Sequence, residues 1–127
     1  MKENKLININ NYKPIKKYKN ALKNKKMIIS ENWNKKGIYC ITNKLNGRKY
    51  VGCSWTNLGK RLSNYYQNSY LKKNSGLILP AILKYGHSSF QIEIIKYLHK
   101  KNIILKKEKY YINKIKSNYN IRKKNWT

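Results

Sequence analysis

The spacing of apolar residues changes along this chain, and each change predicts a different kind of element. From Gly37 to Gly52, two short arms rich in β-branched and aromatic residues alternate between apolar and polar positions, as strands do. Farther along, apolar residues recur every three or four positions, which is the period of an amphipathic helix. The pattern predicts a hairpin over 37–52, a strand over 89–98, and helices over 57–70, 75–85 and 101–116.

The predicted hairpin sorts its side chains onto two faces. Asn46-Gly47 tolerates the positive φ angles of a tight turn, and such a turn would place Cys40 opposite Cys53. On the second face, two phenols flank Gly52, which should leave backbone open to a ligand. The expected faces are Ile38, Cys40, Val51 and Cys53 on the buried side, and Tyr39, Ile41, Asn43, Tyr50, Gly52 and Ser54 on the other.

Capping and breaking residues set the predicted helix ends. Thr56 or Asn57 can cap the first helix, and Gly86 can end the second. Pro80 is awkward inside the second helix, which should therefore start near Leu79 or be kinked there.

The first part of the chain, residues 1–36, is rich in Asn and Lys and has little apolar periodicity. We expect a mostly solvated basic arm, with one amphipathic helical stretch after Pro14. This arm either anchors the protein on phosphates or makes no fixed contacts. The predicted domain covers residues 37–121, and a short basic tail covers 122–127.

Charge narrows the choice of partners. The formal net charge is +26, from 30 basic and 4 acidic residues, and there is no aspartate. An A/T-rich genome explains the many lysines but not the near absence of acids, so a polyanion such as nucleic acid is the expected partner. No apolar run approaches 18 residues, which predicts a soluble protein with no membrane partner.

The remaining chemistry of the side chains is sparse. Cys40 and Cys53 fall on the predicted core face and are expected to be structural thiols. His87 and His99 have no further ligand at metal-binding spacing, so both are expected at the surface.

Glu108 is the carboxylate that most needs an explanation. It falls within the apolar stripe of the helix predicted over 101–116, where a charge is costly unless something of opposite charge meets it. Its partner is either one of the many cations of the chain or a divalent metal, for which a carboxylate is a suitable hard oxygen ligand. Glu93 alternates with the buried face of its strand and is expected to form an ordinary salt bridge.

Several short motifs follow one another in a familiar order. They are G-I-Y at 37–39, Y-V-G at 50–52, N-L-G-K-R at 57–61, Glu108 on a late helix, and Y-N-I at 119–121. In this order they resemble the signature of the GIY-YIG nuclease family. Together with the predicted elements, the resemblance implies a small α/β fold (an α+β sandwich), with a three-stranded, mostly antiparallel sheet flanked by helices.

The resemblance also implies a role for each site residue. Glu108 would be the single metal ligand, and Arg61 would steady the scissile phosphate, although an arginine packed over aromatic rings fits the spacing equally well. Tyr39 would be the general base or the group that activates the water, which requires the metal and nearby cations to lower its pKa. Tyr50 would orient the water or a phosphate oxygen.

Two further residues have supporting roles in this picture. Tyr65 either assists the proton transfer or only packs, and Asn120 is expected to tie the chain end to the site by hydrogen bonds. The family spacing is broken at Trp55-Thr56, which adds one residue between Gly52 and Asn57.

The resulting hypothesis is a metal-dependent DNA endonuclease of the intron-encoded homing type. It would use one Mg²⁺ and no small-molecule cofactor, act on DNA as a monomer, and reside in the mitochondrion, with a phage or bacterial origin as the next choice. The first alternative is a nucleic-acid binder without catalysis, such as an RNA maturase or a decayed nuclease, whose tyrosines stack on bases. A ribosome-associated basic protein would explain the charge but not the motif spacing.

Overall fold

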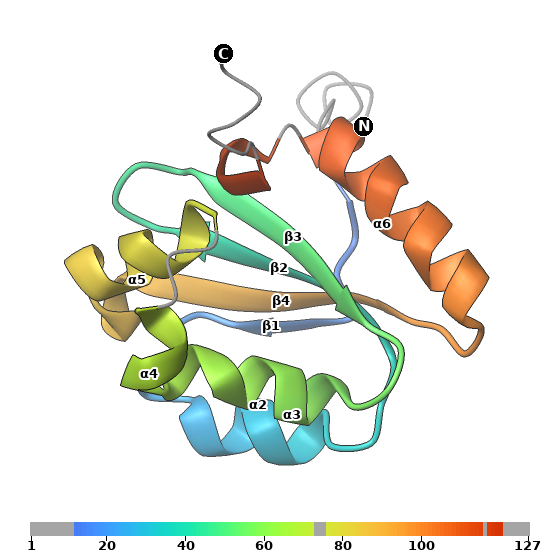
Figure 1. The fold of residues 1–127 in the computed structure, drawn as a ribbon, viewed down its shortest axis with the longest axis horizontal. Helices are drawn as coiled ribbons and strands as arrows, with labels where there is room; N and C mark the ends of the chain where they lie inside the picture. The colour runs from blue at the N-terminus through green and yellow to red at the C-terminus, as the bar shows by residue number, and fades with distance from the viewer. Residues whose placement is uncertain (1–11, 73–75, 116, 121–127) are drawn as a thin grey trace, which may run out of the picture.

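A four-stranded antiparallel sheet with the strand order β1-β4-β2-β3 forms the centre of the computed structural model (Figure 1). The structure describes residues 12–72, 76–115 and 117–120. The strands are β1 (Lys16–Tyr18), β2 (Gly37–Asn43), β3 (Lys49–Ser54) and β4 (Phe90–Tyr97). The helices are α2 (Lys25–Glu31), α3 (Leu58–Ser63), α4 (Asn68–Leu71), α5 (Ile78–Tyr85) and α6 (Lys101–Ile115), and three 3₁₀ turns are η1 (Asn64–Tyr66), η2 (His87–Ser89) and η3 (Asn118–Asn120). The α/β class is confirmed, with one strand more than the three predicted.

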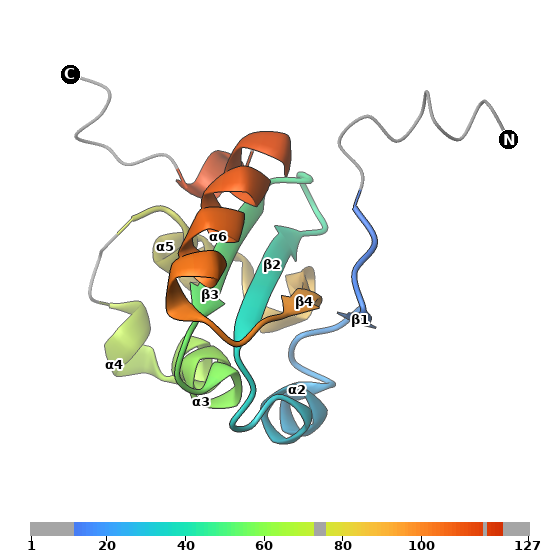
Figure 2. The same ribbon diagram turned by 90° about the vertical axis from the view of Figure 1, so that its right-hand side faces the viewer.

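Two apolar clusters lie on opposite faces of the sheet. On one face, α2 to α5 pack against Tyr39, Ile41 and the alternate residues of β4. On the other face, α6 packs against Ile38, Cys40 and Val51 (Figure 2). Every residue of β2 is therefore buried, and the strand is covered on both sides. The predicted sorting of the hairpin side chains onto two faces is confirmed.

The register of the hairpin differs from the prediction by two residues. Cys40 pairs with Val51, not with Cys53, and five residues, 44–48, connect the two strands. The side chains of Asn43 and Asn46 accept hydrogen bonds from the backbone two residues on, at 2.9 Å each, and these turns favour the wider loop over the two-residue one. Within this loop, Gly47 is the residue with a positive φ, 76°. Because the side-chain period of a strand is two, this shift leaves every side chain on its predicted face.

The segment before Gly37 is not the solvated arm that we expected. Where the sequence suggested a helix, Lys16 to Tyr18 form strand β1, which pairs with β4. Tyr18, Ala21 and Ile28 are buried in the larger apolar cluster. Pairing with the free edge of β4 outweighs the weak helical pattern of this stretch. The folded unit therefore extends toward the N-terminus beyond the predicted boundary, while residues 1–11 and the tail 122–127 lie outside the described ranges.

Local signals explain the helix ends. Asn57 caps α3, because its side-chain oxygen accepts a hydrogen bond from the Lys60 N–H at 3.1 Å. The single helix predicted over 57–70 is instead divided into α3, η1 and α4. Pro80 lies in the first turn of α5, where its missing N–H costs nothing, and Gly86, with φ 82°, ends that helix.

Three polar predictions are tested in and around the core. Glu93 is buried and accepts a hydrogen bond from the Tyr12 hydroxyl, so the expected salt bridge is wrong for the described residues. The two cysteines are free and buried, as predicted. His87 is only partly exposed, because it stacks on the Tyr66 ring and hydrogen-bonds to a backbone carbonyl. Within the described ranges, no helix is long and apolar enough to span a membrane.

Candidate active site

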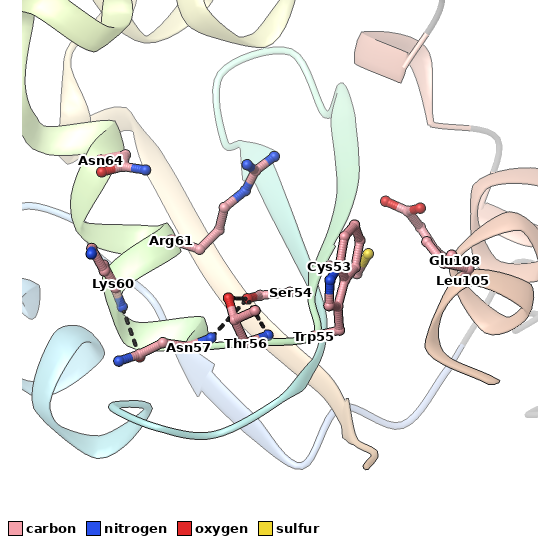
Figure 3. A pocket seen from close by; sticks show the side chains of 10 residues that line it. All are labelled: Cys53, Ser54, Trp55, Thr56, Asn57, Lys60, Arg61, Asn64, Leu105 and Glu108. Carbon is pink, nitrogen blue, oxygen red and sulfur yellow. Dashed lines mark hydrogen bonds between the residues drawn. The ribbon is translucent and has the colours of Figure 1, made fainter. Parts of the chain in front are cut away.

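A cavity of about 560 Å³ lies at the end of β3, where the strand leads into α3 (Figure 3). It is bounded by the last residues of β3, the following loop, α3 and α6. Its lining residues are Cys53, Ser54, Trp55, Thr56, Asn57, Lys60, Arg61, Asn64, Leu105 and Glu108. The opening thus combines basic, amide, apolar and carboxylate groups.

The position of β3 in the sheet explains how this cavity is built. Helices α3 and α6 cover opposite faces of the sheet, so a central strand would keep their side chains apart. Because β3 is an edge strand, Arg61 from α3 and Glu108 from α6 line the same space beyond its edge. Two residues that are distant in sequence and lie in different layers are brought to one site.

Arg61 is held by a tyrosine rather than by a carboxylate. Its Nε–H donates a hydrogen bond to the Tyr39 hydroxyl oxygen at 3.3 Å. Tyr39, and to a lesser extent Tyr65, hold the pKa of the Arg61 guanidinium above its ordinary value, so its charge is permanent. No carboxylate of the described residues forms an ion pair with it. The terminal nitrogens of this guanidinium can therefore bind an anion in the cavity.

Tyr39 and Tyr65 form a buried pair behind Arg61. Their hydroxyl oxygens are 2.7 Å apart, and neither side chain lines the cavity. Burial raises the pKa of both phenols, and Arg61 offsets only part of this effect. Both hydroxyls are thus neutral at physiological pH, and Tyr39 reaches the cavity through its bond to Arg61.

Gly52 has a different function from the one expected. A Cβ atom at this position would lie 2.5 Å from the Tyr39 phenol. The glycine therefore makes room for the Tyr39 ring, and its backbone is not open to a ligand.

Tyr50 and Asn120 adjoin this arrangement. The Tyr50 ring lies 6.4 Å from that of Tyr39, and burial raises the pKa of its phenol. The Asn120 side-chain amide makes two hydrogen bonds to the backbone of Val51, accepting from its N–H at 2.8 Å and donating to its carbonyl at 2.9 Å. At the edge of β3, Asn120 thus supplies the two hydrogen bonds that a further strand would make with the Val51 backbone, next to Tyr50 and Gly52.

Glu108 faces the cavity from α6 and is about half-buried. It forms no ion pair with a cation of the described residues, although the chain has 30 lysines and arginines. Burial raises the pKa of its carboxyl group, while the Cys53 thiol and Arg61 partly offset this effect. Burial and the Glu108 charge in turn raise the pKa of the Cys53 thiol to about 12, so that thiol is neutral.

The donor set suits one divalent cation of the hard type. A carboxylate without a cation partner beside a cavity supplies an oxygen ligand, and the cavity has room for water and a phosphate group. Among the described residues, no group of three or more histidine, cysteine or acidic side chains could enclose a metal ion. Glu108 would therefore be the one protein carboxylate on such a cation.

Of the six predicted site residues, Arg61 and Glu108 line the cavity. Tyr39 and Tyr65 lie behind Arg61 and support it. Tyr50 packs on Tyr39, and Asn120 is hydrogen-bonded to strand β3. Sequence reasoning missed Lys60 and Asn64. Lys60 lies about one helical turn after Asn57, and Asn64 lies about one turn after Lys60. This helical spacing places both residues on the same face as Arg61, and it could have identified them from the sequence. Trp55 and Leu105 carried no comparable signal.

A permanently charged arginine and a carboxylate line one cavity in a small α/β fold, with two tyrosine hydroxyls behind the arginine, and this arrangement suits chemistry on a phosphate group. Residues 35–120, which are most of the chain, match the GIY-YIG catalytic domain. The chain belongs to the GIY-YIG family and is a DNA endonuclease.

Two solved structures resemble the chain. The catalytic domain of the homing endonuclease I-TevI is 27% identical, with a TM-score of 0.55, over 66% of this chain and 91% of that one. A glutamate-to-alanine variant of the I-TevI catalytic domain, described as that of an intron endonuclease, is 26% identical, with a TM-score of 0.57, over 69% of this chain and 91% of that one. No curated protein matches the chain.

Proposed function

We propose that this endonuclease cleaves DNA with one Mg²⁺ held by Glu108, and that it is a homing enzyme encoded within an intron. The observation that carries the proposal is that two opposite charges, Arg61 and Glu108, line one cavity while neither forms an ion pair within the described ranges. In a protein with so few acids, a carboxylate left without a cation partner is best explained by a ligand that the protein binds.

Each residue of the chain has a defined task in this proposal. Arg61 binds the scissile phosphate with its terminal nitrogens, because its Nε is already used by Tyr39. Tyr39 can accept a proton only after its phenol has lost its own, and the hydrogen bond with the Tyr65 hydroxyl would stabilise the resulting phenolate. Tyr50 orients the attacking water or a phosphate oxygen. A divalent cation at Glu108, when bound, would stabilise the negative charge that grows on the phosphate oxygens.

Composition and likeness support the finer points. Both similar structures are catalytic domains of one homing endonuclease, which supports the homing and intron type. The net charge of +26 supports binding to DNA. The frequent Lys, Asn, Ile and Tyr residues have A/T-rich codons, which supports a mitochondrial location. We further propose that the enzyme acts as a monomer, which light scattering of the free protein and of its DNA complex would test.

The decisive experiment is cleavage of supercoiled and linear DNA by the wild type and by Glu108→Ala, with Mg²⁺ and with a chelator. We expect cleavage that requires the metal and is lost in the variant, while DNA binding persists. Glu31→Gln is the matched control, because Glu31 is bound to Tyr18 and Lys16 away from the cavity. This control should cleave like the wild type.

The alternative function predicts a different result. If neither protein cleaves a panel of DNA sequences with Mg²⁺ present, although both bind them, the chain is a nucleic-acid binder and Glu108 is a structural carboxylate. Cleavage that continues in the presence of the chelator would instead show that the enzyme needs no divalent metal.

A further inference from the structure

Trp55 is an exposed aromatic residue on the wall of the active-site cavity. It follows β3 directly, and 39% of its surface remains exposed. Its loop is fixed, because the Ser54 hydroxyl accepts hydrogen bonds from the backbone N–H groups of Thr56 and Asn57, at 3.3 and 3.2 Å. The indole is thus presented from a defined backbone rather than from a free loop.

The orientation of the ring is also restrained. The Lys101 ammonium lies over the indole, 4.7 Å from the ring centroid. An indole has two faces, so a further planar group can stack only on the face that Lys101 leaves free. In Figure 3 the ring rises between the side chains of Arg61 and Glu108 as seen in that view. A group stacked on it would lie beside the phosphate that Arg61 is proposed to bind.

The roles proposed for the other residues leave Trp55 without a task, and its indole does not belong to either apolar cluster. An exposed indole contributes little to the core, and a polyanionic backbone gains nothing from an apolar ring. A nucleobase, in contrast, has a flat π-face, and stacking on an aromatic side chain strengthens binding. A base can use this platform only when it has left its own stack in the duplex.

We infer that Trp55 is a positioning and specificity residue that stacks on a nucleobase next to the scissile phosphate, after that base has left the helix. The inference rests on the proposed function. It implies that the enzyme favours DNA that is already weakened at the cleavage position, because a mismatched base is easier to displace than a paired one. Arg61 would then fix the phosphate and Trp55 the neighbouring base.

The test uses the full chain and a mapped cleavage site. The kcat/KM values are compared for a perfect duplex and for the same duplex with a mismatch next to the scissile phosphate. For the wild type we expect about a tenfold preference for the mismatched DNA, because a mismatched base costs less to unpair and displace than a paired one. Trp55→Phe, which keeps a ring, should retain most of this preference, and Trp55→Leu, which keeps only apolar bulk, should lose it.

A control and a second readout separate stacking from folding. Trp33→Ala removes another exposed tryptophan, 47% exposed and outside the cavity, and should behave like the wild type. A 2-aminopurine base at the position next to the scissile phosphate is quenched by stacking within the free duplex, and its fluorescence should change when the wild type displaces it but not when Trp55→Leu binds. If Trp55→Leu keeps the preference and the fluorescence change, the inference is wrong although the nuclease stands. If the wild type cleaves no DNA, it is the proposed function that fails.

Discussion

At the level of single residues, the surroundings of Arg61 favour its charged form, whereas those of Glu108 disfavour its charged form. Arg61 is stabilised by neighbouring phenols, whereas Glu108 is disfavoured as an anion by its partly buried position. A residue that is kept in an unfavourable state by the fold is a common mark of a functional site. Replacing such a residue is expected to increase the stability of the fold while it reduces activity.

Glu108→Gln should make the free protein more stable while it abolishes cleavage. Because burial raises the folded-state pKa of Glu108 above its unfolded value, its charge reduces stability at neutral pH, and this penalty disappears as the pH falls through the raised pKa. We expect the variant to melt about 1–3 °C higher at pH 7 by calorimetry. At a pH below both pKa values, the difference should vanish.

Glu31→Gln should have the opposite effect on stability. The hydrogen bond from the Tyr18 hydroxyl, 2.6 Å long, lowers the pKa of Glu31. Its charge therefore stabilises the fold at neutral pH, and that contribution is lost as the pH falls through the lowered pKa. A melting temperature that falls for Glu108→Gln and rises for Glu31→Gln at pH 7 would contradict both assignments.

Tyr39→Phe should reduce the rate of cleavage by about 10²–10⁴-fold and leave DNA binding nearly unchanged. The phenol is neutral at rest, so a rate that depends on its loss of a proton should rise with pH in the wild type, and the residual rate of the variant should not. Tyr65→Phe should have a smaller effect, because the bond between Arg61 and Tyr39 remains. Single-turnover rates across pH would measure both, and a larger loss in Tyr65→Phe would make Tyr65 the proton acceptor.

At the level of elements, the segment before the hairpin is part of the fold. Ile28 on α2 is fully buried, and its neighbour Met27 is 48% exposed. Ile28→Ala should lower the free energy of unfolding by about 2–5 kcal/mol, and Met27→Ala, the matched control, should change it little. Urea denaturation would measure both. Equal effects would mean that α2 does not stabilise the domain.

Asn120 gives the second prediction at this level. Asn120→Ala leaves the Val51 N–H and carbonyl without their side-chain partner, which should cost about 1–3 kcal/mol and increase hydrogen exchange at Val51. Asn118→Ala, an exposed residue of the same 3₁₀ turn, is the control. Unchanged exchange at Val51 in the Asn120 variant would show that the edge of β3 is held by other contacts.

Sequence patterns predicted the elements well where local chemistry decides and poorly where long-range pairing decides. The faces of the hairpin followed from a period of two, and the Asn57 cap followed from its own side chain. Strand β1 was missed because three residues acquire their strand conformation only by pairing with β4. Glu93 was misassigned because its partner, Tyr12, lies far away in sequence.

The candidate site was predictable to a similar extent. The motif order pointed to Arg61 and Glu108, which the structure brings to one cavity. The burial of Tyr39 and the filling of the space over Gly52 by its ring were not predictable, because both depend on the packing of the sheet against α3.

At the level of the whole molecule, charge should dominate the encounter with DNA. With a net charge of +26, binding should weaken steeply with added salt, because each neutralised phosphate releases counterions. For six neutralised phosphates, the affinity should fall about a thousandfold between about 50 and 200 mM salt. Fluorescence anisotropy with a labelled duplex would measure the slope, and an affinity that does not change with salt would contradict an electrostatic mode of binding.

The cavity takes Arg61 from α3 and Glu108 from α6, and this has a consequence for translation of the chain. A nascent chain contains Tyr39 and Arg61 long before α6, with Glu108, has been translated. An incomplete chain can therefore contact nucleic acid through its lysines but lacks the carboxylate that completes the cavity. Under the proposed function, a chain that terminates before α6 is a basic protein that cannot cleave DNA, and cleavage begins only when the whole domain has been made.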